Sequence, residues 1–351
     1  MTAPHVIFIA TPLETEHVAR IRATAGSRAE IVHEADLHPP VRYRADHVGV
    51  AGFRRTPDQE ERWRAHMARA TILWDFPPRA AGGPQGLADA PFVRWVQTTS
   101  AGVGQAVARM GLADSEVVVT TASGVHADAL AEFVMLALLA HVKDLPRLRR
   151  EQSAHHWERY CCGELTGQTL LIVGAGKIGR RVADLARAFG MRSIGILARP
   201  DASRAAELGL DRVCGQDELM SVLPEADAVV LSVPHTADTE GMISRAAIAR
   251  MKHGVTLVNV ARGVVIDEEA MIEALRDGRI GFAALDVAAV EPLPPTSPLW
   301  DMENVLVSPH SASTAPSENA KITDIFCRNL EAYLAGRPQD MINVLDKKRL
   351  Y

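Results

Sequence analysis

The chain has 351 residues and carries 38 Lys plus Arg against 43 Asp plus Glu, for a formal net charge of −5. This length exceeds what one ordinary core accommodates, so we expect two domains. The acidic balance and the lack of a basic run argue against nucleic acid and anionic membranes as partners and favour a small diffusible substrate.

The N-terminal segment and the cysteines predict a cytoplasmic protein. The apolar run 6–10 has no basic segment before it and is too short for a signal-peptide core. The cysteines lack CxxC spacing and are interpreted as free thiols in a reducing compartment. They are Cys161, Cys162, Cys214 and Cys327.

The first 123 residues predict a smaller, flavodoxin-like α/β substrate domain. Candidate strands are the apolar runs 6–10, 70–76 and 93–99, which alternate with polar helical stretches. An amphipathic helix from about residue 316 could return to this domain, so we expect residues 316–351 to complete it.

Residues 124–315 predict a dinucleotide-binding domain with a doubly wound parallel sheet, that is, a Rossmann fold. It opens with a long apolar helix over 129–140, which is far shorter than the roughly 20 residues of a membrane span. A buried strand at 170–173, a glycine turn and a helix at 178–189 follow in that order. Further buried strands are expected at 193–197, 228–233, 256–260, 282–287 and 305–308.

The glycine turn has the sequence GAGKIG. Gly174 permits a tight turn, Gly176 lets the backbone approach a pyrophosphate, and Gly179 allows close packing of helix on strand. Lys177 and Ile178 complete the motif at the start of the helix. The strand and helix around the motif favour dinucleotide binding, and a turn that serves packing alone is the alternative.

The end of the next strand indicates the type of cofactor. Leu197 occupies the place where NAD-binding proteins usually carry an acidic residue for the adenosine ribose. No carboxylate there would repel a 2'-phosphate, and Arg199 could bind one. We therefore predict NADP as the preferred cofactor, with NAD as the second choice. The alternative is that Arg199 is a solvated loop residue.

Three further segments, at 258–278, 283–294 and 304–313, resemble the D-isomer-specific 2-hydroxyacid dehydrogenase family, in particular its glyoxylate/hydroxypyruvate reductase-like members. Together with GAGKIG they stand in the family's order and spacing, whereas the first 90 residues resemble it only diffusely. The resemblance implies an enzyme that transfers a hydride between NAD(P)H and a small 2-keto or 2-hydroxy acid.

The same segments hold the catalytic candidates. Arg262 follows a buried strand, and its planar fork suits a carboxylate and the adjoining keto oxygen. His310 follows another strand and can transfer a proton near neutral pH, and the carboxylate of Glu291 could orient its ring. The resemblance assigns these residues as the Arg, Glu and His of the catalytic set. A structural ion pair for Arg262 and a packed histidine at His310 are the alternatives.

The resemblance also extends to substrate and cofactor contacts. The stretch TTSAGVGQ resembles the loop that holds the substrate carboxylate through backbone N–H groups. It supplies Ser100, Ala101, Gly102 and Val103, and Phe76, in an atypical insertion with Trp63 and Trp74, is a further candidate. The cofactor contacts implied by motif position are Val233, Pro234, Thr239, Val260, Ala261, Asp286 and Ser313. No metal site is predicted.

The apolar helix at 129–140 predicts a homodimer built mainly through the nucleotide domain, because its faces need cover. The segment HHWERY that follows could send Trp157 or Tyr160 towards a partner, although plain interface packing is the simpler interpretation. A nucleotide-sensing regulator or corepressor on the same fold is the alternative function, since a fold alone does not determine activity.

Overall fold

The computed structural model describes residues 5–78, 87–201 and 203–350. The chain forms two compact units: unit 1 comprises residues 1–126 and 314–351, and unit 2 comprises residues 127–313. These divisions lie close to the boundaries expected at 123/124 and 315/316. Among the described residues, no helix combines the length and apolar character needed to cross a bilayer.

Unit 1 is built on a five-stranded parallel sheet in the order β2-β1-β3-β4-β5, which is the flavodoxin-like order. The expected flavodoxin-like fold of this domain is therefore confirmed. The strands are β1 (His5–Ile9), β2 (Ala29–Val32), β3 (Ile72–Trp74), β4 (Trp95–Gln97) and β5 (Val118–Thr120). The helices are α1 (Thr15–Ala25), α2 (Pro57–Arg69), α3 (Gly104–Arg109) and α11 (Glu318–Leu334).

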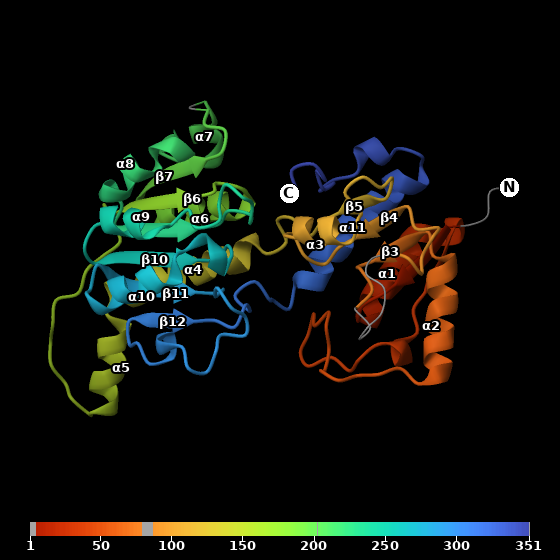
Figure 1. The fold of residues 1–351 in the computed structure, drawn as a ribbon, viewed down its shortest axis with the longest axis horizontal. Coiled ribbons are helices and arrows are strands. Elements are labelled where there is room, and N and C mark those ends of the chain that lie inside the picture. The colour runs from red at the N-terminus through yellow and green to blue at the C-terminus, as the bar shows by residue number, and fades with distance from the viewer. Residues whose placement is uncertain (1–4, 79–86, 202, 351) are drawn as a thin grey trace. The chain divides into compact units, whose positions relative to one another are not determined.

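The C-terminal helix α11 completes the core of unit 1, as the sequence predicts. It lies beside α1 (Figure 1). Phe326 of α11 is fully buried and its ring stacks on that of Trp95, with centroids 4.9 Å apart. The helix therefore buries apolar surface of the sheet that would be exposed to water if the helix were absent.

The interpretation of Trp63 and Trp74 as part of an atypical insertion is wrong. Trp63 lies on α2, a regular helix that begins with a capping box between Thr56 and Gln59, and Trp74 lies in β3. Both side chains are buried in the core of unit 1. Phe76, just after β3, is half-buried and packs on two apolar clusters of the same unit.

Unit 2 is a doubly wound, seven-stranded parallel sheet in the order β12-β11-β10-β9-β6-β7-β8 (Figure 1). Apolar clusters lie on its two faces. The Rossmann domain is thereby confirmed. The strands are β6 (Thr169–Val173), β7 (Arg192–Leu197), β8 (Arg212–Gly215), β9 (Ala228–Leu231), β10 (Val255–Asn259), β11 (Ile280–Leu285) and β12 (Val305–Val307). The helices are α4 (Ala127–Val142), α5 (Leu145–Ser153), α6 (Lys177–Ala188), α7 (Arg204–Leu208), α8 (Leu219–Val222), α9 (Arg245–Arg250) and α10 (Glu268–Arg276).

Three strands escaped the sequence analysis: β2, β5 and β8. Each has only three or four residues. β2 and β8 also carry exposed charged side chains, Glu30 and Arg212. Such short runs do not build an apolar pattern that stands out from loop sequence, and only pairing with a neighbouring strand makes them strands.

Candidate active site

The glycine turn lies at the topological switch point of unit 2, between β6 and β9, where open α/β sheets bind ligands. Gly174 has φ 95°, and a Cβ added there would come within 2.8 Å of the carbonyl oxygen of Ser232. A Cβ on Gly179 would lie 2.5 Å from the carbonyl oxygen of Gly174. Both positions therefore require glycine for backbone geometry, as the motif predicts.

Gly176, the second glycine of the motif, differs from Gly174 and Gly179 because the space beside it is open, which fits a dinucleotide. A Cβ on Gly176 would meet nothing within 4 Å, so the space in front of it is open. The N–H groups of Gly176 and Ile178 have no acceptor within the described part of the chain. Free donors at the first turn of α6 and an open approach form a cradle for a pyrophosphate. This unit therefore fits the dinucleotide that its fold implies.

The end of β7 contains no carboxylate. Leu197 is half-buried, and Arg199 is exposed in the turn that follows. Within the described residues Arg199 has no ion-pair partner. Its guanidinium is thus available, which a 2'-phosphate requires.

His310 and Glu291 form the central pair of the site. The Nδ1 atom of His310 lies 2.8 Å from Oε2 of Glu291, so the carboxylate accepts a hydrogen bond from the ring and Nε2 is directed away from this partner. The second carboxylate oxygen of Glu291 accepts from the backbone N–H of Ala288 at 3.2 Å, which fixes the acid. The imidazole is nearly half exposed, with 46% of the side chain accessible. The pair therefore holds an orientated imidazole at the surface of unit 2.

The backbone around His310 is unusual. His310 has φ 54°, in the left-handed region that residues other than glycine seldom adopt. Its N–H donates to the carbonyl oxygens of Asp286 and Ser308 at 3.0 and 2.9 Å. Conformations of this kind concentrate at functional sites, where surrounding contacts hold them.

Asp286 holds the loop that carries His310. Its Oδ1 atom accepts from the Ser308 hydroxyl at 2.7 Å and from the Ala312 N–H at 2.9 Å. The side chain is buried. One carboxylate oxygen thus serves the loop, and only Oδ2 is left for the cofactor contact that the sequence analysis expected.

Arg262 follows β10 at the same edge of the sheet. One terminal guanidinium nitrogen donates to the carbonyl oxygen of Ala261 at 2.6 Å, and no carboxylate within the described residues pairs with it. Asn259, which is buried, donates from Nδ2 to the Arg262 carbonyl and accepts the Ala261 N–H, each at 3.0 Å. Asn259 therefore shapes the turn that presents Arg262, and a structural ion pair finds no support.

The remaining cofactor candidates lie on the loops that follow β9, β10 and β12. Val233 is half-buried, and Val260 and Ala261 are buried. The Thr239 hydroxyl donates to the Pro234 carbonyl at 2.7 Å and accepts the Thr236 N–H at 2.9 Å, so it holds its own turn. Ser313, the last residue of unit 2, is half-buried.

The substrate loop lies in unit 1, directly after β4. Ser100, Ala101 and Gly102 are exposed, and Val103 is buried. Within the described chain, the N–H groups of Ser100, Ala101 and Gly102 donate to no acceptor. The Thr98 hydroxyl fixes the loop by donating to the Ser100 carbonyl at 2.7 Å. Consecutive free N–H groups on a held loop are suited to a carboxylate.

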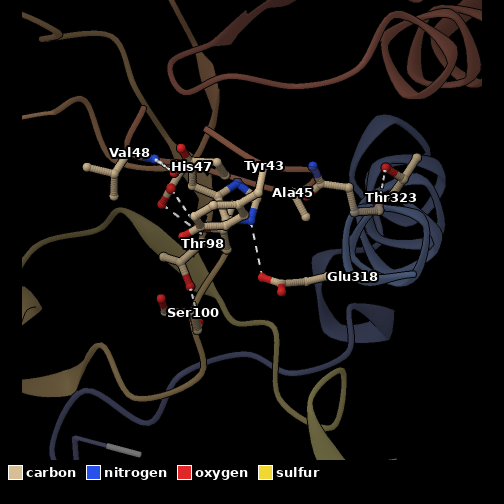
Figure 2. A network of polar contacts seen from close by, with 12 residues as sticks. Tyr43, Ala45, His47, Val48, Thr98, Ser100, Glu318 and Thr323 are labelled. Atoms are coloured by element: carbon tan, nitrogen blue, oxygen red, sulfur yellow. Dashed lines mark hydrogen bonds and ion pairs between the residues drawn. The ribbon is translucent and has the colours of Figure 1, made fainter. Parts of the chain in front are cut away.

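A polar network beside this loop was missed by the sequence analysis. Asp75 has φ 63° and accepts the Thr99 hydroxyl at 2.7 Å, and burial raises the pKa of Asp75. His47 lies nearby, with Nε2 3.2 Å from Oε1 of Glu318 at the start of α11 (Figure 2). These residues come from four separate segments, so no sequence pattern connects them.

Comparison with known proteins identifies the family of the chain. The sequence profile of the D-isomer specific 2-hydroxyacid dehydrogenase NAD binding domain matches residues 135–312. The chain belongs to this dehydrogenase family.

Several named proteins are similar to this dehydrogenase. It is 37% identical over 234 residues to the glyoxylate reductase of Korarchaeum cryptofilum, covering 64% of this chain and 69% of that protein. It is 34% identical over 326 residues to the D-3-phosphoglycerate dehydrogenase of Mycobacterium tuberculosis, covering 87% of this chain and 59% of that longer one. A D-isomer specific 2-hydroxyacid dehydrogenase from Xanthobacter autotrophicus Py2, solved with NADPH and MES, has a TM-score of 0.77 at 28% identity and covers 99% of this chain and 100% of that one.

The family defines the reaction class. This dehydrogenase transfers a hydride between NAD(P)H and a 2-keto or 2-hydroxy acid, as its sequence predicts. Its relatives carry the names of dehydrogenases and reductases, so a purely regulatory role on the same fold is not favoured.

Proposed function

We propose that this dehydrogenase reduces 2-keto acids with NADPH and uses His310 as the proton donor. The observation that carries the proposal is the 2.8 Å contact between His310 Nδ1 and Glu291 Oε2, at the edge of the sheet where Arg262 also stands. The test is oxidation of NADPH, followed at 340 nm, with a panel of 2-keto acids. If no acid in the panel supported turnover, the proposal would be wrong.

Each residue has a separate task in this proposal. The bound nicotinamide supplies the hydride. Arg262 binds the keto acid through its fork and stabilises the negative charge that develops on the keto oxygen. Glu291 keeps Nδ1 protonated, so that Nε2 of the imidazolium can give its proton to that oxygen. In the oxidation direction the neutral ring accepts the proton from the hydroxyl.

Within unit 1, the proposal assigns the substrate carboxylate to the loop 100–103. The free N–H groups of Ser100, Ala101 and Gly102 support this role, because they can donate to both carboxylate oxygens. Val103 anchors the loop in the core. The acidic balance of the whole chain, with no basic run, supports small acids over nucleic acid as the partner.

Cofactor contacts are proposed along the carboxyl edge of unit 2. The turn from Gly174 to Gly179 binds the pyrophosphate, with Lys177 as a flanking cation. Asp286 receives the nicotinamide carboxamide through Oδ2. Val233, Pro234, Val260 and Ala261 contact the cofactor through their backbone. Thr239 holds the turn after β9, and Ser313 is a further contact.

We expect a preference for NADPH over NADH of about tenfold or more, because a charge-assisted hydrogen bond from Arg199 to the 2'-phosphate contributes about 1.5 kcal/mol or more. Arg199→Ala should weaken NADPH alone. Leu197→Asp should oppose NADPH by repulsion and offer NADH a ribose acceptor. The measurement is kcat/KM for both cofactors in the parent and the two variants.

Two results would contradict the phosphate assignment. The first is a parent enzyme that prefers NADH. The second is an Arg199→Ala variant that loses both cofactors equally. Arg204→Ala, on the nearby helix α7 with Glu207 as partner, serves as the matched control.

We further propose a homodimer formed through unit 2, in a reducing, cytoplasmic environment. Helices α4 and α5 and the segment after them expose Leu136, Leu145 and Leu148, and Trp157 is 96% exposed. Tyr160 is bound within its own chain, with its hydroxyl 2.9 Å from the Lys143 carbonyl oxygen. The exposed apolar set supports burial against a second copy, and the free cysteines support the compartment.

One chain has a mass of 38.0 kDa, and light scattering at micromolar concentration should give twice this mass. Trp157→Ser together with Leu148→Ser should shift the equilibrium towards monomer, because both changes remove apolar contact area. Val48→Ser, which replaces an exposed valine in unit 1, is the control. A parent that is monomeric at this concentration would exclude the dimer.

A further inference from the structure

Unit 1 contains a cavity of about 510 Å³ at the carboxyl ends of β1 and β2. Its walls come from the loop 12–16 after β1, from His33 and Ala35 after β2, from the segment 38–46 and from Asn319 of α11. This volume lies within the usual range of small-molecule sites. None of the catalytic candidates lines it, so the proposed reaction leaves the cavity unexplained.

The cavity is mainly apolar. Leu13, Pro39, Val41 and Tyr43 contribute hydrocarbon or ring surface. Val41 and Tyr43 are about half exposed, which places them where a ligand would cover them. A binding partner for these walls is therefore a bulky and largely apolar group.

The buried polar atoms of the wall that lack partners within the described residues are both ring nitrogens of His38 and Oδ1 of Asn319. His38 is only 6% exposed, and neither of its ring nitrogens has a hydrogen-bond partner within the described residues. Its ring stacks on that of His33, with centroids 5.7 Å apart. A buried polar group without a partner is unfavourable, and a ligand atom in the cavity would remove this cost.

Burial favours the neutral form of both rings. Burial lowers the pKa of His38 to about 4 and also lowers the pKa of His33. A neutral imidazole offers one donor and one acceptor, which matches a hydroxyl group. It does not offer the positive charge that a second carboxylate needs.

The charged groups in the wall also exclude an acid. Glu14 accepts from the Asn319 side chain at 2.7 Å and from the Ala45 N–H at 3.2 Å. Asp46 accepts from the Arg42 side chain at 2.8 and 2.9 Å and from the N–H groups of Val48 and Gly49. Arg44 faces the cavity but is paired with Glu16 at 3.1 Å. Among the described residues that line the cavity, no free cation is thus available to an anionic ligand.

The cavity lies on the same edge of the sheet as the loop 100–103. Strands of a parallel sheet place their carboxyl ends on one edge, and β1 stands two strands from β4. With about 4.8 Å between strands, the end of β1 lies on the order of 10 Å from the end of β4. Figure 2 shows the cavity residues Tyr43 and Ala45 in the same close-up as Ser100 and Thr98. A molecule about 10 Å long could span the two places.

We propose that this cavity holds the side chain of the substrate, and that the preferred substrate is a 2-keto acid with an aromatic side chain that carries a hydroxyl at its far end. The loop 100–103 binds the carboxylate, the apolar walls contact the ring, and His38 with His33 hydrogen-bonds the terminal hydroxyl. This inference rests on the proposed function, because it assumes that keto acids bind at the loop.

The first experiment is a substrate panel at saturating NADPH: glyoxylate, phenylpyruvate, 4-hydroxyphenylpyruvate and 2-oxoglutarate. We expect kcat/KM for 4-hydroxyphenylpyruvate to exceed that for phenylpyruvate about tenfold and those for glyoxylate and 2-oxoglutarate by more. If glyoxylate or 2-oxoglutarate is the better substrate, the inference is overturned and the proposed function stands. If none of the acids is reduced, both fail.

The second experiment uses His38→Phe, which keeps a ring and removes the hydrogen bonds. The ratio of kcat/KM for 4-hydroxyphenylpyruvate to that for phenylpyruvate should fall to about one, and the ligand-free protein should unfold at a higher temperature. His253→Phe, at an exposed loop histidine of unit 2, should leave the ratio as in the parent.

Val41→Trp gives an independent test that does not depend on how the protein tolerates a change at His38. Because Val41 is 56% exposed, its replacement should not disturb the core. The larger side chain should obstruct the cavity and lower the ratio of kcat/KM for 4-hydroxyphenylpyruvate to that for glyoxylate at least tenfold. A ratio equal to that of the parent in both variants would show that the substrate side chain binds elsewhere.

Discussion

Replacement of His310 by alanine should lower kcat for keto-acid reduction by about 10²- to 10⁴-fold, the usual contribution of a general acid. The ring is orientated by Glu291 and follows β12, which is four strands from β6 and its glycine turn. The dissociation constant of NADPH should therefore stay within about twofold of the parent value. Stopped-flow measurement of hydride transfer and fluorescence titration of NADPH separate the two quantities. A variant that kept most of its kcat would exclude His310 as the proton donor.

Glu291→Gln serves as the graded companion of this variant. The amide retains the shape of the side chain but not the charge that stabilises a protonated ring, so the pH above which reduction declines should become lower. The measurement is the pH profile of kcat, because a purely structural change would not move the pH at which kcat declines. An unchanged profile would show that Glu291 has no part in the proton transfer and has only a structural role.

The nucleotide unit was largely predictable because its elements carry strong local patterns. A fully buried strand such as β6 reads as an unbroken apolar run, and Gly174 and Gly179 stand where any Cβ would collide with backbone or with a strand side chain. His310, Glu291 and Arg262 follow strands or lie in segments of recognisable sequence. Their roles were suggested by resemblance, and their proximity to one sheet edge follows from parallel topology.

Other parts depended on contacts that one sequence does not display. Ser308 and Asn259 shape the loops of the site through hydrogen bonds to Asp286 and to backbone groups, yet neither side chain stands in a distinctive pattern. The sequence analysis assigns Trp63 and Trp74 to an atypical insertion, although apolar residues in a core and in a binding site have the same composition. Only burial distinguishes the two.

The cavity beside His38 is another feature that the sequence alone does not predict. Its walls come from segments after β1 and β2 and from α11, which are distant in the sequence and adjacent only in the folded sheet. A histidine in a loop sequence normally indicates a solvated side chain. It becomes informative when it is buried with both ring nitrogens unpartnered, and that is a property of the three-dimensional structure alone.

Arg262→Lys should lower kcat/KM for keto acids by about 30-fold or more, although the positive charge remains. The reason is the geometry of the guanidinium: a lysine ammonium is a point charge that cannot hold a carboxylate and the adjoining keto oxygen with two parallel hydrogen bonds. Loss of one hydrogen bond to a charged group costs up to about 3 kcal/mol, which corresponds to about 100-fold. Arg262→Gln, which also removes the charge, should therefore lose more than Arg262→Lys.

The partition between kcat and KM shows which interaction is lost. If Arg262 only held the ground-state carboxylate, KM would rise with kcat unchanged, whereas stabilisation of the developing oxyanion requires kcat to fall as well, and we expect both. Arg276→Lys, at an exposed arginine that ends α10, controls for the general effect of the substitution and should leave both constants near the parent values. Unfolding temperatures within a few degrees of the parent confirm that the variants are folded. An Arg262→Lys enzyme with parental kcat/KM would show that the guanidinium fork has no part in the reaction, and that its hydrogen bond to the Ala261 carbonyl is its whole function.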